Sequence, residues 1–215
     1  MTLILGFDTS GPHCSAVLLK DDEVLADTHE DMGRGQAEKL LPLLEDLLQS
    51  AGRDWQDLDA IGVGIGPGNF TGIRIAVSAA RGLSLSLEIP AVGVSQLEAV
   101  ALGSDEPVLT CLSAPRDHLY VQGFGTKTEI APRFLSLDEL DPDWAEPGLR
   151  CVGTAVKEAS ERLNSAVAPV PYAPGEAVAR VAALRWQDSP DRPAPLYLKS
   201  ADAAPPRDPA PVILP

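Results

Sequence analysis

The sequence predicts an α/β protein with mixed sheets, and three observations lead to this fold class. Short apolar runs of strand length alternate with longer segments whose apolar residues recur every three or four positions. Over the first half of the chain the order is three strands, then helix, strand, helix, strand, helix, which is typical of helices packed on a partly parallel sheet. A hydrophobic fraction of 45% over 215 residues is also enough to form a substantial core.

The chain opens with three predicted antiparallel strands. Residues 3–7 and 14–19 are apolar and flank the polar turn 8–12, which is the pattern of a hairpin. Residues 23–31 alternate imperfectly between apolar and polar side chains, as expected for an outer strand with one solvent-exposed face. We therefore expect a three-stranded antiparallel unit at the start of the fold.

The most informative stretch is residues 61–87, where a buried strand, a glycine turn and an apolar helix follow one another. Residues 60–65 are apolar and uncharged, and Gly66-Pro67-Gly68 then predicts a turn. Asn69 is a good cap for a helix beginning near Phe70 or Thr71. An earlier segment, 36–51, has leucines at helical spacing over a wide face and is predicted to be the first helix.

The remaining elements predict a second α/β unit. A strand at 91–94 and a helix after Ser95 complete the first unit, and strands at 107–112, 119–124, 129–135 and 150–153 follow. Helices are expected near Asp138, at 154–163 and at 176–187, with an edge strand at 195–199. We therefore divide the chain into an N-terminal domain (1–104), a C-terminal domain (105–199) and a Pro/Ala-rich tail (200–215), and the two units could be a duplication.

Two turns could bind phosphate. The five candidate residues are Asp8, Thr9, Ser10, Gly66 and Gly68. A carboxylate with neighbouring hydroxyl groups suits a metal-bound phosphate, and glycines at a helix start let an anion approach the backbone amides. The alternatives are an Asx turn at Asp8 and a tight strand-to-helix connection at the glycines. The spacing does not match a Walker motif, and no Lys-Ser or Lys-Thr pair follows.

Composition excludes several classes of function. Cys14, Cys111 and Cys151 are far apart, and the three histidines lack helical metal-ligand spacing, so we expect no metal and no cofactor. A formal net charge of −14 opposes nucleic-acid binding by this chain alone. With neither a signal peptide nor an apolar run of membrane-spanning length, a cytoplasmic location is expected.

Several segments together resemble one family. They are Phe7-Asp8-Thr9-Ser10, the stretch Gly64-Ile65-Gly66-Pro67-Gly68-Asn69-Phe70-Thr71-Gly72-Ile73-Arg74, then Arg81-Gly82-Leu83 and Val92-Gly93-Val94-Ser95-Gln96-Leu97. This combination resembles the TsaB (YeaZ) family over most of residues 1–102, and residues 195–199 resemble its C-terminal Pro-x-Tyr-Leu-Arg element. The resemblance implies an actin-like ATPase and sugar-kinase (ribonuclease-H-like) fold with two α/β subdomains.

The resemblance also implies a function. Family members are non-catalytic subunits of the machinery that makes threonylcarbamoyladenosine in tRNA; they pair with the catalytic subunit TsaD, cooperate with the ATPase TsaE, and meet tRNA only through the complex. TsaD carries metal-binding histidines on the helix after residues 91–94, where this chain has Gln96 and Val100. In the second domain this chain has Ser113-Ala114-Pro115-Arg116 where the family often has an Asp-Ala-Arg-Arg segment, so the first acidic residue of that segment is missing.

The family's first two helices pack against those of TsaD. Carried over, this makes eight residues interface candidates, although each could equally belong to the core: Ala37, Leu40, Leu41, Leu44, Ile73, Ala76, Val77 and Ala80. The same helices could support a homodimer when no partner is present. The rival hypotheses are an actin-like ATPase acting on its own and an M22-type peptidase homologue. Ser113 and His118 could be written into a peptidase triad, but their spacing gives no reason to expect contact.

Overall fold

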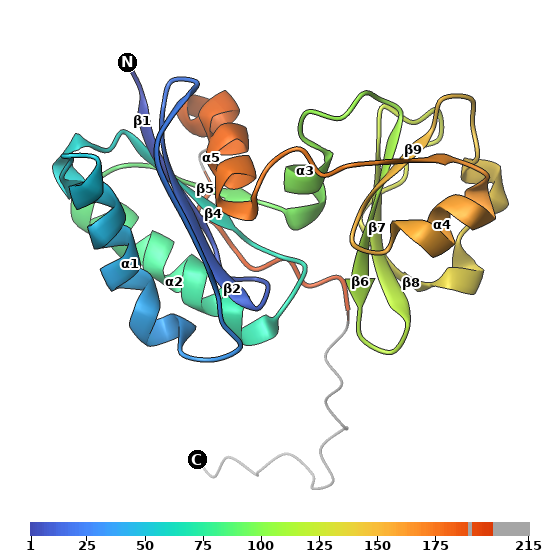
Figure 1. Ribbon diagram of the computed structural model, residues 1–215, viewed down its shortest axis with the longest axis horizontal. Coiled ribbons are helices and arrows are strands. Elements are labelled where there is room, and N and C mark those ends of the chain that lie inside the picture. Colours follow the sequence, from blue (N-terminus) through green and yellow to red (C-terminus); the bar gives the residue numbers. More distant parts are fainter. Residues whose placement is uncertain (189–190, 200–215) are drawn as a thin grey trace, which may run out of the picture.

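A computed structural model describes residues 1–188 and 191–199 and shows two α/β domains side by side (Figure 1). Each domain is built on a five-stranded mixed sheet, with strand orders β3-β2-β1-β4-β5 and β10-β9-β6-β7-β8. The predicted α/β class and the mixed sheets are therefore confirmed. The strands of the first sheet are β1 (Leu3–Asp8), β2 (His13–Lys20), β3 (Glu23–Asp31), β4 (Ala60–Gly64) and β5 (Ala91–Val94).

The first sheet is buried on both faces. Its central strand β1 pairs antiparallel with β2 and parallel with β4. Side chains alternate along a strand, so Leu3, Leu5 and Phe7 point to one face while Ile4 points to the other. All five residues of β4 are buried, which explains why this strand reads as a continuous apolar run.

Helices α1 (Gln36–Ser50) and α2 (Phe70–Leu87) cover the face of the sheet that carries Leu5 and Phe7. The cap predicted for α2 is confirmed, because the Asn69 side chain accepts a hydrogen bond from the Gly72 amide at 2.9 Å. Ser95 caps the short helix α3 (Gln96–Ala101) in the same way, by accepting from the Glu98 amide. These local signals fix where the helices begin.

The second domain repeats the strand pattern of the first. A meander of three antiparallel strands continues into two parallel ones, as in the first sheet. The same order in both sheets is what a duplication would produce. Its elements are β6 (Val108–Ala114), β7 (His118–Phe124), β8 (Arg133–Ser136), β9 (Arg150–Gly153), α4 (Val156–Leu163) and β10 (Ala166–Ala168), with short 3₁₀ turns at Leu137–Glu139 and Pro142–Trp144. Two further 3₁₀ turns, Trp55–Asp57 and Trp186–Asp188, lie before β4 and after the last helix.

The last helix, α5 (Pro174–Arg185), departs from the domain division predicted above. It follows β10 in the chain, but its buried residues pack on the first sheet, against Ile4 and Val17. Helix α5 therefore covers the face opposite α1 and α2 (Figure 1). The chain returns to its first domain because the small residues Ala179 and Ala182 fit closely over Gly6 and Gly62, respectively.

Three further expectations differ from the structure. Residues 195–199 form no strand, although the Leu196 amide donates to the Ile65 carbonyl at 2.8 Å. The expected strand at 129–135 is the shorter β8, and the helix expected near Asp138 is a single 3₁₀ turn. Strand β10 was not predicted, because its three residues carry too short a pattern. The predicted tail, 200–215, lies outside the described residues.

Among the described residues, no helix has both the length and the apolar character needed to cross a lipid bilayer.

Candidate functional site

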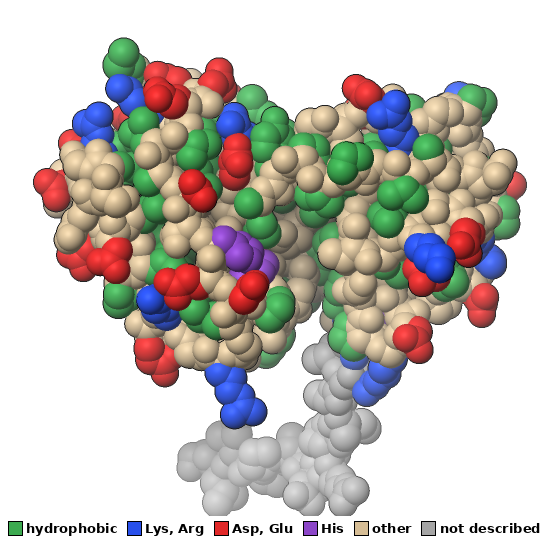
Figure 2. Space-filling model, in the orientation of Figure 1, with side chains coloured by type: hydrophobic (Ala, Val, Ile, Leu, Met, Phe, Trp, Pro, Cys, Tyr) green, Lys and Arg blue, Asp and Glu red, His purple; other side chains and the backbone are tan. Residues whose placement is uncertain are grey.

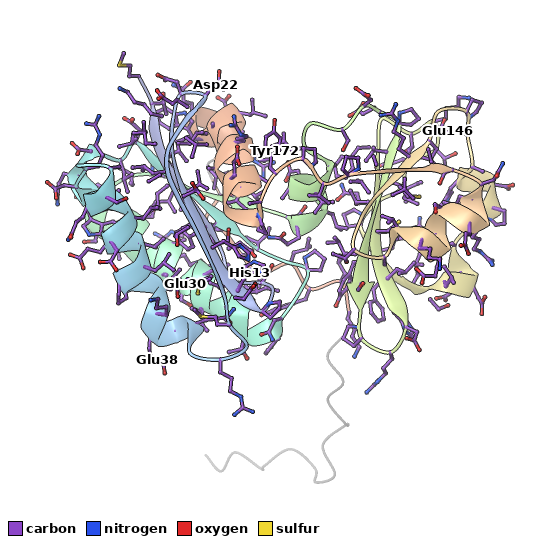
Figure 3. The ribbon with its side chains drawn as sticks, viewed as in Figure 1. His13, Asp22, Glu30, Glu38, Glu146 and Tyr172 are labelled. Atoms are coloured by element: carbon purple, nitrogen blue, oxygen red, sulfur yellow. The ribbon has the colours of Figure 1, made fainter. Side chains whose placement is uncertain are left out.

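A cleft of about 540 Å³ lies between the two domains. Its first wall comes from the β1–β2 turn, the turn before α2, and the starts of α3 and α5. The second domain contributes Ser113, Tyr120 and Thr154. The space-filling view shows the molecule notched between its domains, and His13 and Tyr172 lie on the side of the first domain that faces the second (Figures 2 and 3). Both predicted phosphate-binding turns thus contribute residues to the lining of this cleft.

The carboxylate of Asp8 lies behind this wall with its hydrogen-bonding capacity filled. The side chain is fully buried at 0% exposure. Its Oδ1 accepts from the Ser10 amide at 3.1 Å, from the Ser10 hydroxyl at 3.0 Å and from His13 Nε2 at 2.8 Å. Its Oδ2 accepts from Gln96 Nε2 at 2.7 Å. Asp8 is therefore committed to protein donors on both oxygens, as buried carboxylates require.

The two predicted turns are hydrogen-bonded to each other. The Asn69 amide donates to the Ser10 carbonyl at 2.6 Å, and the Thr9 hydroxyl donates to the Gly72 carbonyl at 2.7 Å. Because the Asn69 side chain also caps the Gly72 amide, two backbone amides at the start of α2 are already satisfied. The structure thus brings the two turns together, and the Asn69 amide and the Thr9 hydroxyl hold them to each other.

The β1–β2 turn is also held from α1. The side-chain amide of Gln36, which is buried at the first position of α1, donates to the Gly11 carbonyl at 2.8 Å and to the His13 carbonyl at 2.7 Å. Helix α1 therefore fixes the turn that carries Asp8 and His13.

The cleft itself has an uncharged lining. None of the described residues that line it is Asp, Glu, Lys or Arg, and Val100, Leu112 and Val170 add apolar surface. Burial raises the pKa of the Tyr120 hydroxyl, so this group stays neutral at physiological pH. In the second domain Ser113, near the end of β6, lines the cleft, and its hydroxyl accepts a hydrogen bond from the Thr154 hydroxyl at 3.2 Å. The lining can hold a neutral or apolar group more readily than a polyphosphate with its cation.

The structure also places the eight interface candidates. Six of them lie in the core of this chain, with exposures of at most 3%, and in this conformation no partner can reach them: Leu40, Leu44, Ile73, Ala76, Val77 and Ala80. Only Ala37 and Leu41 are exposed, on the outer side of α1. The helical spacing identified the apolar stripe correctly, but that stripe faces the chain's own sheet.

Neither a metal centre nor a peptidase triad is assembled within the described residues. No cluster of three His, Cys, Asp or Glu side chains could hold a metal ion there. His118 is stacked on Phe134 with ring centroids 4.6 Å apart, and its Nδ1 bonds the Arg116 carbonyl at 2.6 Å. Ser113 bonds Thr154 instead of His118. The two residues therefore do not form a nucleophile–base pair.

Sequence reasoning missed two partners of Asp8. His13 begins β2, five residues after Asp8, and a histidine beside an Asp-containing turn was the available signal. Gln96 is 88 residues away, and no pattern along the chain connects it to Asp8.

Known proteins with similar sequences point to one family. The sequence family described as "TsaD: tRNA N6-adenosine threonylcarbamoyltransferase" matches residues 25–137, just over half of the chain. The "tRNA threonylcarbamoyladenosine biosynthesis protein TsaB" of Escherichia coli is 40% identical over 101 residues, which is 47% of this chain and 43% of that protein. An uncharacterised protein of Mycobacterium tuberculosis is 32% identical over 209 residues, covering 95% of each chain.

A solved structure adds the decisive match over nearly the whole length. YeaZ from Pseudomonas aeruginosa superposes with a TM-score of 0.74 and 29% identity, covering 92% of this chain and 100% of that one. The chain belongs to the TsaB (YeaZ) family. The alignment to the E. coli TsaB spans less than half of that relative's length.

More distant structures show the fold of this TsaB-family chain. Component A of the (R)-2-hydroxyglutaryl-CoA dehydratase of Acidaminococcus fermentans superposes with a TM-score of 0.52 at 12% identity, over 87% of this chain and 98% of that one. The predicted actin-like ATPase and sugar-kinase fold is therefore confirmed.

Proposed function

We propose that this chain is a non-catalytic subunit in the synthesis of threonylcarbamoyladenosine in tRNA, and that it supports a TsaD-type catalytic chain by binding it. The observation that carries the proposal is the state of Asp8, whose two oxygens are taken up by Ser10, His13 and Gln96. The names of its TsaB relatives support the assignment to this pathway. A chain whose cleft carboxylate is committed in this way serves better as a structural partner than as a catalyst.

The outer sides of α1 and α2 are the surface we assign to the partner. Three large apolar side chains are exposed there: Leu41 at 47%, Phe70 at 52% and Leu85 at 77%. An elongated surface with several exposed apolar side chains is suited to a protein partner, which would remove them from water. Helices α1 and α2 pack on each other, so these residues belong to one layer. We assign the interface to this exposed surface, because six of the eight residues expected from the sequence are buried.

The remaining parts of the proposal concern the assembly. A TsaE-type ATPase would act on the complex, and tRNA would be held mainly by the partners because this chain carries a net charge of −14. Because the substrate of the proposed complex is tRNA, we expect the chain to be cytoplasmic. In the absence of a partner, the same helices could pair two copies of the chain.

The test mixes this chain with the TsaD-type chain of the same organism and measures complex formation by analytical ultracentrifugation, together with threonylcarbamoyladenosine formation on tRNA. We expect a complex and increased modification. The double variant Leu41→Glu and Leu85→Glu should weaken the complex at least about tenfold, because it places two charges in an apolar contact.

A matched control is Leu184→Glu on α5, since Leu184 is 78% exposed but lies on the opposite face of the first sheet. This variant should bind the partner as the wild type does. If the wild-type chain neither binds the catalytic chain nor increases modification, the proposed function is wrong.

An ATPase acting alone is the second candidate, and the cleft between the domains is the observation in its favour. Titration calorimetry of the isolated chain with ATP and Mg²⁺ separates the two. The committed Asp8 and the uncharged lining predict no binding. Binding with turnover that is lost in Asp8→Asn would favour the ATPase.

A further inference from the structure

Two arginines on α2 are held in place by the end of the described chain. Arg74 Nε donates to the Tyr197 hydroxyl at 3.0 Å, and Arg81 Nε donates to the Pro193 carbonyl at 2.7 Å. The Arg74 guanidinium also lies over the Phe70 ring, 3.7 Å from its centroid. Phe70 and Tyr197 contact each other, with ring centroids 5.1 Å apart. Residues 193–197 thus orient both guanidinium groups on the surface of α2.

Each arginine keeps donors for another molecule. Only Nε of either residue has a hydrogen-bond partner within 1–188 and 191–199, so the paired Nη groups are available. Helix α2 contains no Asp or Glu between Phe70 and Leu87. Glu88 and Asp191 share a surface hollow with Arg81 but form no ion pair with it in the described part of the chain. Two guanidinium groups without an ion-pair partner in 1–188 and 191–199 thus lie along α2, on a chain of net charge −14.

The spacing of the two arginines suggests what they bind. Residues seven apart lie on nearly the same side of a helix, and seven steps of 1.5 Å separate them by roughly 10 Å. A guanidinium whose Nε is anchored presents its two Nη groups as a rigid fork, which fits a carboxylate in two-point contact. We propose that Arg74 and Arg81 bind two carboxylates about 10 Å apart on the catalytic protein partner.

This inference rests on the proposed function and identifies the polar contacts of its interface. A protein is favoured over RNA because Phe70 and Leu85 expose apolar surface on the same helix, and the overall charge repels a phosphate backbone. In this arrangement Tyr197 is a positioning residue, which acts through Arg74. The aromatic pair and the two guanidinium groups have the composition found at the centre of protein interfaces.

The test measures the dissociation constant of the complex between the full chain and the catalytic chain. The double variant Arg74→Gln and Arg81→Gln should weaken it roughly 10- to 100-fold, the range for lost hydrogen bonds to charged groups. The wild-type affinity should fall with added salt, and the double variant should lose most of that dependence. The control Arg133→Gln removes one exposed arginine from the second domain and should leave the affinity unchanged.

A double-mutant cycle tests the positioning role. Tyr197→Phe keeps the ring and removes the hydroxyl, so it should weaken binding a few-fold in the wild type and have no further effect in Arg74→Gln. A purely structural role for Tyr197 would give the same loss in both backgrounds.

The outcomes separate the two proposals. If the wild-type chain does not bind the catalytic chain, the proposed function fails and the carboxylate contact fails with it. Equal binding by the wild type and the arginine variants overturns the carboxylate contact alone. Unchanged protein binding with a loss of tRNA binding to the assembled complex would instead assign the arginines to RNA phosphates, and would also overturn it.

Discussion

In both domains a meander of three antiparallel strands continues into two parallel strands, but the helices that cover the two sheets differ in their outer surfaces. Helix α2 follows β4 and exposes Phe70, Leu85 and two arginines. Helix α4 follows β9, the equivalent strand, and its exposed positions carry only charged side chains: Lys157, Glu158, Glu161 and Arg162. One sheet topology therefore supports a surface suited to a partner in the first domain and an ordinary solvated surface in the second.

The segments that precede these helices differ as well. Between β3 and β4 lies the long helix α1, whereas between β8 and β9 the chain makes only two 3₁₀ turns, Leu137–Glu139 and Pro142–Trp144. Pro142, Pro147 and Gly148 interrupt helix formation there. The second domain thus lacks an equivalent of α1 in the described chain. The surface that we propose for partner binding therefore has no counterpart on the described part of the second domain.

The largest loss of stability is expected for a buried residue of α1, the helix that the second domain lacks. Leu44 is 0% exposed on α1, so Leu44→Ala should lower the free energy of unfolding by about 2–5 kcal/mol. Leu41→Ala, one turn earlier on the outer side, should change it by less than about 0.5 kcal/mol. Urea denaturation of both variants checks this. Equal losses would show that the two sides of α1 are not distinct.

A second prediction tests the return of α5 to the first sheet. A methyl group at Gly6 would come within 2.6 Å of the Ala179 Cα on α5. Gly6→Ala should therefore destabilise the chain by about 1–3 kcal/mol through overpacking. Gly33→Ala is the control, because nothing lies within 4 Å of a methyl group there. A neutral Gly6→Ala would mean that α5 does not pack closely on β1.

A third prediction concerns the domain junction. Gln96→Ala removes the donor to Asp8 Oδ2 and should cost about 1–3 kcal/mol, because a buried carboxylate oxygen loses its partner. Gln49→Ala on the exposed side of α1 is the matched control and should have little effect. Thermal unfolding measures both. An unchanged stability for Gln96→Ala would show that Asp8 does not depend on its hydrogen bond from α3.

The smallest effect is expected in the second domain, at the 3₁₀ turn that stands in place of α1. Hydrogen bonds from the Ser136 amide and hydroxyl lower the pKa of the Glu139 carboxyl below its ordinary 4.5. A lowered pKa in the folded state adds stability above the unfolded value, and this is lost as the pH falls through the folded value. The melting temperature of the wild type should therefore fall slightly more below pH 4.5 than that of Glu139→Gln. If the melting temperatures of the two proteins fall in parallel with pH, this prediction is wrong.

Much of the fold could be predicted because its signals are local. Apolar runs fixed most strands, and Asn69 and Ser95 fixed helix starts, since a cap acts within three residues. The weak points were short or interrupted segments. Strand β10 has three residues, and Glu129–Ile130 lies ahead of β8 and not within it.

The candidate site could be predicted only in part. Asp8, Ser10 and Gly68 do meet at the domain junction, because turns at the carboxyl ends of neighbouring parallel strands lie at one edge of a sheet. The donors that satisfy Asp8 were missed, since hydrogen bonding between distant segments leaves no periodic trace in the sequence. The sequence likewise identified the apolar stripe of α1 and α2, but it did not show whether the chain's own sheet or a partner covers that stripe.

By itself, the sequence determined the α/β class, the order of most elements and the family, because each depends on residues that are neighbours along the chain. Only the tertiary structure decided that α5 packs on the first sheet, that His13 and Gln96 hold Asp8, and that Tyr197 lies against Arg74. These contacts depend on how distant segments fill space around a shared core. Burial, which decides whether an apolar side chain is core or surface, is a property of that packing.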